Sequence, residues 1–533
     1  MADIPTLLSN PYIIAIIVYL LALVGVGAWK SRAVRDSADF MVAGRNLPWY
    51  VLVGTLLATW IGNGSLFGGA GLGYRNGLAG LWHSAGAWAG IVLVYFIAKR
   101  IRNFGKVTVP DIFEARYNTA AGILATVITI IAYLTIVSYQ FRGGGRVLSI
   151  ITDGMISVEA GIVITAVFAI TYTVLAGMIS VVYTDVVNGV LMIFGILLAG
   201  IFLVHAVGGL PEVIATAEAA GKLSLFGNWA DERSAIDSAP IIAFSFLVPT
   251  MLLLLGDANM YQRIFSARDG GNAKKAVLVW VFGVILLETS ISFLGLTGSV
   301  AAEQGIIPEL FPGGGAADVA ANLSENVIPA VAVAALPMVI GMLLVATMLA
   351  IIVSTADSFL LVPATNLTRD VYQRFIAPNA PERRVVIIGR AMVLILGFIA
   401  YLLVDQFPTI LTAAYTAYLI YGAGITPALL AAFLWKRATK QAAVTSIASG
   451  AAVTVFWTFY LSRQDFFATW HPMLQEVTYP AVTVSVLALV IVSLLTPKPP
   501  ASAWEPFFRE GDDVREEPSR TPGPSASRRR AAV

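Results

Sequence analysis

The sequence predicts an all-α, polytopic membrane protein with about 13 transmembrane helices. Hydrophobic residues make up 58% of the 533 residues, and charged residues only 12%. A water-soluble chain of this length has too little interior to bury so much apolar surface. The apolar residues also gather in runs long enough to cross a bilayer, with short polar loops between them. The lipid bilayer is therefore the first partner that the sequence predicts.

The predicted spans follow one another along the chain from residue 12 to residue 496. The first, near residues 12–29, lacks the charged start and the small-residue cleavage site of a secretory signal, so we interpret it as a retained helix. The others lie near 49–74, 79–98, 119–150, 156–176, 181–206, 239–262, 276–300, 330–362, 385–404, 407–435, 441–461 and 476–496. An odd number of spans places the two ends of the chain on opposite sides of the membrane.

Lysine and arginine are unevenly distributed among the loops. They concentrate near residues 30–45, 99–116, 263–275, 369–390 and 436–440, whereas the segment 301–327 carries acidic residues instead. Because cytoplasmic loops retain positive charge, this alternation predicts a cell-membrane protein with its N-terminus outside and its C-terminus in the cytoplasm. The transmembrane domain then covers residues 1–496, and residues 497–533 are predicted to form a disordered cytoplasmic tail.

Composition excludes several other functions. The formal net charge is only +2 and the basic residues are dispersed, so no surface for nucleic acid is expected. Cysteine is absent, which excludes disulfides and thiolate metal sites. The three histidines, His83, His205 and His471, do not have the spacing of metal ligands, so an enzyme embedded in the membrane is not expected.

The second predicted span is interrupted by small and polar residues, in the segments 61–65 and 68–71. Glycine frees backbone groups from the helical ladder, and freed carbonyls inside a bilayer need a partner. Glycines also allow close helix packing, which is the alternative explanation. The presence of Asn63 and Ser65 in the break favours a binding site, because broken helices at the bilayer midplane are typical of transporters. Asn63 is therefore a candidate solute contact.

The ninth span contains a second polar cluster, at residues 354–358, after a long apolar run. Its hydroxyl groups suit a small hard cation, as carboxylate and carbonyl oxygens do. The alternative for any single Ser or Thr is a hydrogen bond back to the preceding helical turn.

Together these segments resemble the sodium:solute symporter family, which includes proline, sugar, pantothenate and choline carriers. The motifs that carry the resemblance are residues 58–62, residues 172–178 leading to 183–185, and residues 354–358 followed by 366–372. The resemblance implies a core of two five-helix inverted repeats with broken helices, at residues 49–206 and 239–435. The first span and the last two would be peripheral additions. The resemblance also implies that the import of a small organic solute is coupled to the entry of a sodium ion.

The resemblance implies a sodium site made of five oxygens from two spans. They are the carbonyls of Ala58, Ile61 and Ile351 and the hydroxyls of Ser354 and Thr355. The acidic residue that the family has near the ion path falls on Asp185. An ionisable group inside a span is expensive and usually functional, although a cap or a salt bridge at a helix end would also explain it.

The solute is predicted from aromatic residues. Within the family, Trp60, the turn at 77–82 and the triplet 261–263 look most like the choline carriers. Trp60, Trp82 and Tyr139 are predicted to face one cavity, where aromatic rings would attract an organic cation. The alternative is that these rings anchor the protein at the membrane interface.

Asp257 would add a negative charge to the predicted solute cavity. It occupies the position where the choline carriers have a tryptophan, six residues before Arg263. Its carboxylate could hold a cationic head group, bind a second sodium ion or meet Arg263. We therefore expect a small cationic or zwitterionic amine as the solute, with Trp60 and Asp257 as contacts.

The expected mechanism is alternating access, in which one repeat rocks against the other around a central site. Two alternatives stay open. A proton-coupled carrier of the same fold would use Asp185, and a channel or sensor would use the same broken helices without accumulating solute.

Overall fold

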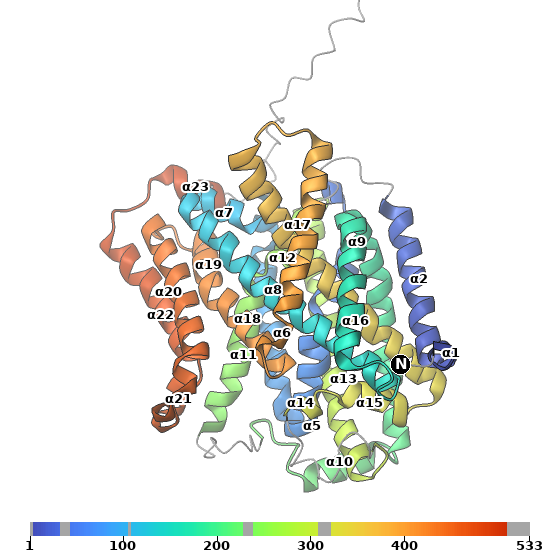
Figure 1. Cartoon of the computed structure of the whole chain (residues 1–533). Coiled ribbons are helices and arrows are strands. Elements are labelled where there is room, and N and C mark those ends of the chain that lie inside the picture. Colours follow the sequence, from blue (N-terminus) through green and yellow to red (C-terminus); the bar gives the residue numbers. More distant parts are fainter. Residues whose placement is uncertain (1–3, 32–42, 105–107, 228–237, 308–320, 509–533) are drawn as a thin grey trace, which may run out of the picture.

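The computed structural model describes residues 4–31, 43–104, 108–227, 238–307 and 321–508. Within these ranges the regular elements are helices, and the long ones cross the molecule from one end to the other (Figure 1). One isolated bridge joins Leu47 and Ala267. The predicted all-α fold is confirmed.

The helices fall into two consecutive groups, with additions at the periphery. The first group contains α4 (Trp49–Trp60), η2 (Gly64–Gly69), α5 (Ala70–Asn76), α6 (Leu81–Asn103), α8 (Thr119–Ile151) and α9 (Val158–Ala206). The second contains α11 (Ala239–Gly256), α12 (Ala258–Ser266), α13 (Gly270–Glu303), α16 (Met338–Asn366), η6 (Leu367–Ile376), α17 (Glu382–Leu402), α18 (Ile410–Gly424) and α19 (Thr426–Leu434). In each group the first span is the broken one, as expected for inverted repeats.

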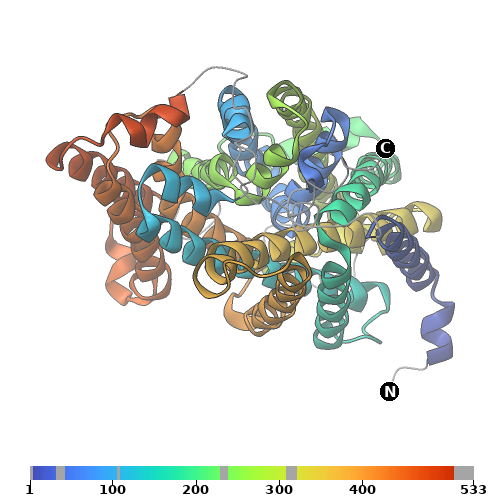
Figure 2. The same cartoon turned by 90° about the horizontal axis from the view of Figure 1, so that it is seen from above.

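The peripheral spans are α2 (Pro11–Ser31), α20 (Lys440–Phe459) and α22 (Thr478–Leu495). Viewed from above, α2 lies at one end of the elongated bundle and the C-terminal helices lie at the other (Figure 2). The shorter elements are α1 (Ile4–Ser9), η1 (Ala43–Arg45), η3 (Gly77–Gly80), α7 (Val109–Arg116), α10 (Leu210–Ala219), α14 (Ala321–Ser324), α15 (Val327–Ala334), η7 (Val404–Gln406), η8 (Leu461–Arg463), η9 (Asp465–Thr469), α21 (Pro472–Gln475) and α23 (Ala501–Phe508).

The predicted count of 13 spans is not confirmed. Among the described residues, 11 helical segments are long and apolar enough to cross a membrane. The other two predicted spans fall on shorter apolar helices, Pro11–Gly27 and Trp49–Trp60. The predicted span 330–362 also begins later than expected, because Pro337 separates α15 from α16.

Helix α9 contains two of the predicted spans and reverses direction between them. The Tyr172 hydroxyl donates a hydrogen bond of 2.9 Å to Thr184 Oγ1, 12 residues later. In a straight helix the two Cα atoms would be about 18 Å apart, beyond the reach of these side chains. Apolar segments therefore lie on either side of the bend, at Val158–Leu175 and Ser180–Ala206.

Side-chain caps define where several helices start. Asn118, Asp269, Thr409 and Thr439 accept hydrogen bonds from the first-turn N–H groups of α8, α13, α18 and α20. These caps satisfy backbone donors that have no partner within the helix. Polar residues thus fix the ends of helices whose interiors are almost wholly apolar.

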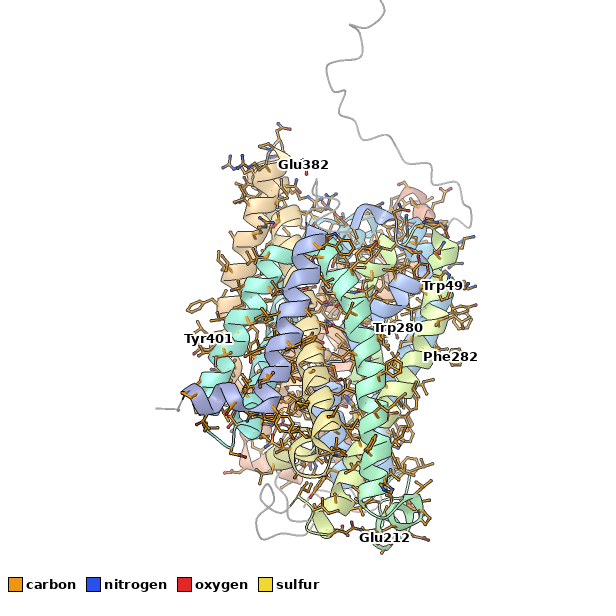
Figure 3. The ribbon with its side chains drawn as sticks, turned by 90° about the vertical axis from the view of Figure 1, so that its right-hand side faces the viewer. Trp49, Glu212, Trp280, Phe282, Glu382 and Tyr401 are labelled. Carbon is orange, nitrogen blue, oxygen red and sulfur yellow. The ribbon has the colours of Figure 1, made fainter. Side chains whose placement is uncertain are left out.

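The outer surface is apolar, as a lipid-facing surface requires. On α13, Trp280 points inward and is fully buried, whereas Phe282, two residues later, points outward and is 65% exposed (Figure 3). Glu212 and Glu382 lie near opposite ends of the molecule, beyond this apolar belt. The side chains confirm a multi-pass membrane protein.

The segment predicted as a disordered tail begins with an ordered helix. Phe507 of α23 is buried, and its ring lies 4.3 Å from that of Phe104 and 5.5 Å from that of Phe433. The packed structure therefore extends past the predicted boundary at residue 496. The prediction for residues 509–533 lies outside the described residues.

Candidate functional site

The first broken span interrupts the helix at the predicted position. Helix α4 ends at Trp60, and Ile61 adopts extended backbone angles. The Gly62 carbonyl accepts hydrogen bonds from the N–H groups of Ser65 and Leu66, which starts the wide turn of η2. A Cβ atom on Gly64 would lie 2.4 Å from the Tyr418 hydroxyl of α18, so this glycine allows a close approach.

Ser354 and Thr355 lie directly opposite this break. The Ser354 hydroxyl is 3.1 Å from the Ala58 carbonyl and 3.2 Å from the Ile351 carbonyl. The Thr355 hydroxyl is 3.1 Å from the Ile61 carbonyl. All five predicted sodium ligands therefore meet between α4 and α16, and all are buried. We call these five residues the oxygen cluster; its donor set of carbonyls and hydroxyls suits a small hard cation.

The second group has its own break, at a position that was not predicted from the sequence. Helix α11 ends at Gly256, and Asp257 caps α12 by accepting hydrogen bonds from Asn259 and Met260 N–H groups at 2.7 and 3.3 Å. The signal was present as a glycine followed by an N-capping aspartate, within a run otherwise interpreted as one apolar span.

Asp257 is also held by a tyrosine from the first group. The Tyr133 hydroxyl donates to Asp257 Oδ1 at 2.9 Å, and the Tyr133 ring stacks on Tyr421. Asp257 is fully buried, and its Oδ2 atom has no hydrogen-bond partner among the described residues. A buried carboxylate oxygen thus lies at the break, where a solute could bind.

Asp185 lies in a buried network of charged and hydroxyl groups. Arg263 donates to Asp185 Oδ2 at 3.2 Å, to Thr55 at 2.9 Å and to Ser358 at 2.7 Å. Thr55 donates to the same Asp185 oxygen at 2.6 Å. Ser358 in turn donates to Asp357 at 3.3 Å. The network joins α4, α9, α12 and α16, so Arg263 meets Asp185 rather than Asp257.

The predicted solute contacts are brought together only in part. The Asn63 amide donates to the Tyr139 and Gln140 carbonyls, both at 3.1 Å, so Asn63 and Tyr139 share one side of the first break. Trp82 lies elsewhere: its indole donates to the Leu225 carbonyl at 2.7 Å. Its ring also packs on two phenylalanines of the neighbouring loop and helix, Phe226 and Phe244.

Trp60 has an unexpected partner, Glu288 of α13. The Trp60 indole N–H donates to Glu288 Oε1 at 2.9 Å, and the Ser65 hydroxyl donates to the same oxygen at 3.0 Å. Glu288 was not among the residues predicted from the sequence, although an acidic residue within the predicted span 276–300 is by itself a sign of function.

An ion pair joins the segment before α15 to the helix bundle. Glu325 accepts hydrogen bonds from the Ile410 and Leu411 N–H groups at the start of α18 and from Arg146 of α8, the last at 2.7 Å. Its side chain is almost fully buried. Because Glu325 precedes α15, this pair joins a connecting segment to two of the spans around the site.

Comparisons with known proteins agree with this architecture. The model of the sodium:solute symporter family matches residues 40–450. The chain is 26% identical to the osmoregulated proline transporter OpuE of Bacillus subtilis (strain 168), over 94% of this chain and 98% of that protein. It is 25% identical to the sodium/proline symporter of Salmonella typhimurium, over 94% of this chain and 96% of that protein. These relatives give no support to a particular likeness to choline carriers.

Solved structures share the fold. A substrate-bound, outward-open Na+-coupled sialic acid symporter matches with a TM-score of 0.77 at 19% identity, over 92% of this chain and 98% of that one. Mhp1, a nucleobase-cation-symport-1 family transporter in a closed conformation, matches with a TM-score of 0.56 at 12% identity, over 89% and 99%.

Proposed function

Because the chain belongs to the sodium:solute symporter family, we propose that it imports a small zwitterionic amine with sodium, and that proline is the first solute to test. The protein is a transporter rather than an enzyme, and sodium is its coupling ion. The identity of the solute and the residues that bind it are the proposed part.

The oxygen cluster is the observation that supports the proposed sodium site. Its hydroxyls and carbonyls come from α4 and α16, which belong to different repeats, so an ion bound there holds the two repeats together. Movement of one repeat against the other would separate the ligands and release the ion. One charge crossing about 100 mV supplies roughly 2.3 kcal/mol for solute accumulation.

The second break supports an amine as the solute. Asp257 has one oxygen engaged in capping α12 and one without a partner, so its negative charge is available to an ammonium group. Trp60 ends α4 at the other break and is the proposed aromatic contact, with Asn63 and Tyr139 beside it. Proline fits this site as a zwitterion with a secondary ammonium group, and two relatives are proline carriers.

The proposed orientation keeps the N-terminus outside. The basic segments near α7, α12 and the start of α17 lie towards one end of the bundle, and α10, α14 and α21 lie towards the other (Figure 1). This arrangement supports the predicted orientation, because the end with more positive charge is expected to face the cytoplasm.

A binding screen with purified protein tests the solute. Proline, betaine, choline, a sugar and a carboxylic acid without an amine are measured with and without sodium. We expect sodium-dependent binding of proline or betaine. Binding of only the sugar or the carboxylic acid would refute the amine. Uptake against a gradient in proteoliposomes then separates a carrier from a channel or sensor, and uptake driven by pH alone in sodium-free buffer would favour proton coupling.

A further inference from the structure

Glu288 is a buried acidic residue that is neither a sodium ligand nor a proposed solute contact, although it accepts a hydrogen bond from the proposed contact Trp60. It lies within the membrane-spanning part of α13 and is 1% exposed. An ionised carboxylate in such a place is costly unless a cation neutralises it. Glu288 therefore needs either a positive partner or a proton.

Its two oxygens have different surroundings. Oε1 accepts the Trp60 indole N–H and the Ser65 hydroxyl. Because an indole N–H only donates, Oε1 serves as an acceptor and is not where a proton would reside. Oε2 makes no hydrogen bond of ordinary geometry within the described residues, but the Ser84 hydroxyl and the Trp88 indole of α6 lie close enough to interact with the carboxyl group. A proton on Oε2 would neutralise Glu288 and leave both bonds to Oε1 intact.

No protein cation neutralises Glu288 in the part of the chain that the structure describes. Helix α4 and η2 contain no charged residue. The charged groups on the surrounding helices are bonded to other residues, lie at the surface or lie at helix ends. Arg75 of α5 is bonded to Ser324, Asp185 of α9 is paired with Arg263, and Glu212 and Glu218 of α10 lie at the surface. Lys99, Arg100 and Arg102 lie at the end of α6, and Lys274 and Lys275 lie at the start of α13. His83 of α6 is bonded to Tyr415 of α18, and the hydroxyl groups of Tyr415 and Tyr418 interact with Glu288 but carry no positive charge.

A proton suits this site better than a metal ion. Sodium needs several oxygen ligands, but Trp60 presents an N–H donor towards the carboxyl group and cannot coordinate a cation through it. The indole N–H of Trp88, on the neighbouring α6, is buried and is a further donor close to the carboxyl group. A proton needs only the one free oxygen.

We propose that Glu288 binds a proton on Oε2 and exchanges it during transport, so that the carrier moves protons as well as sodium and solute. Both groups that hold Oε1 belong to the first break, Trp60 at the end of α4 and Ser65 in η2. When the break opens to the water on one side of the membrane, Glu288 loses these donors and Oε2 gives its proton to that water. Once the carrier faces the other side, the carboxylate takes a proton from the water there, and the neutral form is restored before the break closes again. This proton exchange rests on the proposed carrier function.

Infrared difference spectroscopy tests the protonated carboxyl without any solute. Wild-type protein in lipid should show the C=O stretch of a buried carboxylic acid, and this band should change when sodium is added. Glu288→Gln should lack the band, whereas Glu303→Gln, which removes an exposed carboxyl at the end of the same helix, should keep it. A spectrum of Glu288→Gln identical to that of the wild type would overturn the proposal.

Proton movement is then measured in proteoliposomes that contain a pH indicator and are given a sodium gradient and proline. We expect a proline-dependent pH change that falls at least tenfold in Glu288→Gln and is kept in Glu303→Gln and, partly, in Glu288→Asp. Proline uptake without any pH change in the wild type would overturn the proton proposal and leave the carrier function standing. Absence of proline uptake would instead refute the proposed solute, and the infrared result would still decide the state of Glu288.

Discussion

Removal of one hydroxyl from the oxygen cluster should weaken sodium binding far more than it weakens folding. Ser354 and Thr355 each supply one of five oxygens, at 3.1 Å from a carbonyl of α4. A hydrogen bond or ligand to a charged group is worth about 1.5 to 3 kcal/mol, whereas a neutral buried hydrogen bond contributes about 1 kcal/mol. We therefore expect Ser354→Ala and Thr355→Val to raise the sodium Kd by roughly 10- to 150-fold.

The assay is sodium-dependent binding of solute to purified protein, with Tm in detergent measured alongside. Thr347→Val is the matched control, because Thr347 is also a buried hydroxyl on α16 but bonds to the Leu343 carbonyl, away from the cluster. It should lower Tm as much as the other variants and leave the sodium Kd unaltered. If both cluster variants keep the wild-type sodium dependence, or if Thr347→Val weakens sodium equally, the assignment is wrong.

Three further predictions test other parts of the site. Asp257→Asn keeps the cap on α12 but loses the charge, so solute affinity should fall at least tenfold, and an unaltered Kd would exclude Asp257 as the contact. Arg263→Gln leaves Asp185 buried without its cation and should destabilise the fold by about 3 to 5 kcal/mol, seen as a lower Tm that Asp185→Asn partly restores. Burial lowers the pKa of Lys222 to about 8, with partial opposition from Glu303, so the folded state loses this proton before the unfolded chain does. Stability should therefore rise between about pH 8 and the ordinary lysine pKa near 10.4, and Lys222→Met should abolish that rise in Tm.

The sequence predicted those parts of the site that depend on local patterns. The first break is predictable because glycines and polar residues interrupt an apolar run, and the adjacent hydroxyls at 354 and 355 are visible within one motif. The second break escaped because Gly256 and Asp257 occupy only two positions between apolar segments. The partners of long-range contacts were also not predictable, since Trp60 and Glu288 are 228 residues apart and meet only through the packing of α4 on α13.

The position of Trp82 was not predictable for the same reason, because it depends on contacts with residues distant in the sequence. A tryptophan on the span after the break was expected to face the solute, but the direction of a side chain around a helix depends on its neighbours. Here the Leu225 carbonyl and the rings of Phe226 and Phe244 hold the indole against the connecting loop. Sequence gives the residue type and the approximate depth of such a side chain, whereas the fold gives its direction.

The hydroxyls of the oxygen cluster donate to the same carbonyls that would bind the ion. An ion that enters the cluster therefore competes with hydrogen bonds within the protein, so its net binding energy is smaller than the sum of its five contacts. On the proposed mechanism, this competition lets the carrier release sodium quickly on the side where the sodium concentration is low.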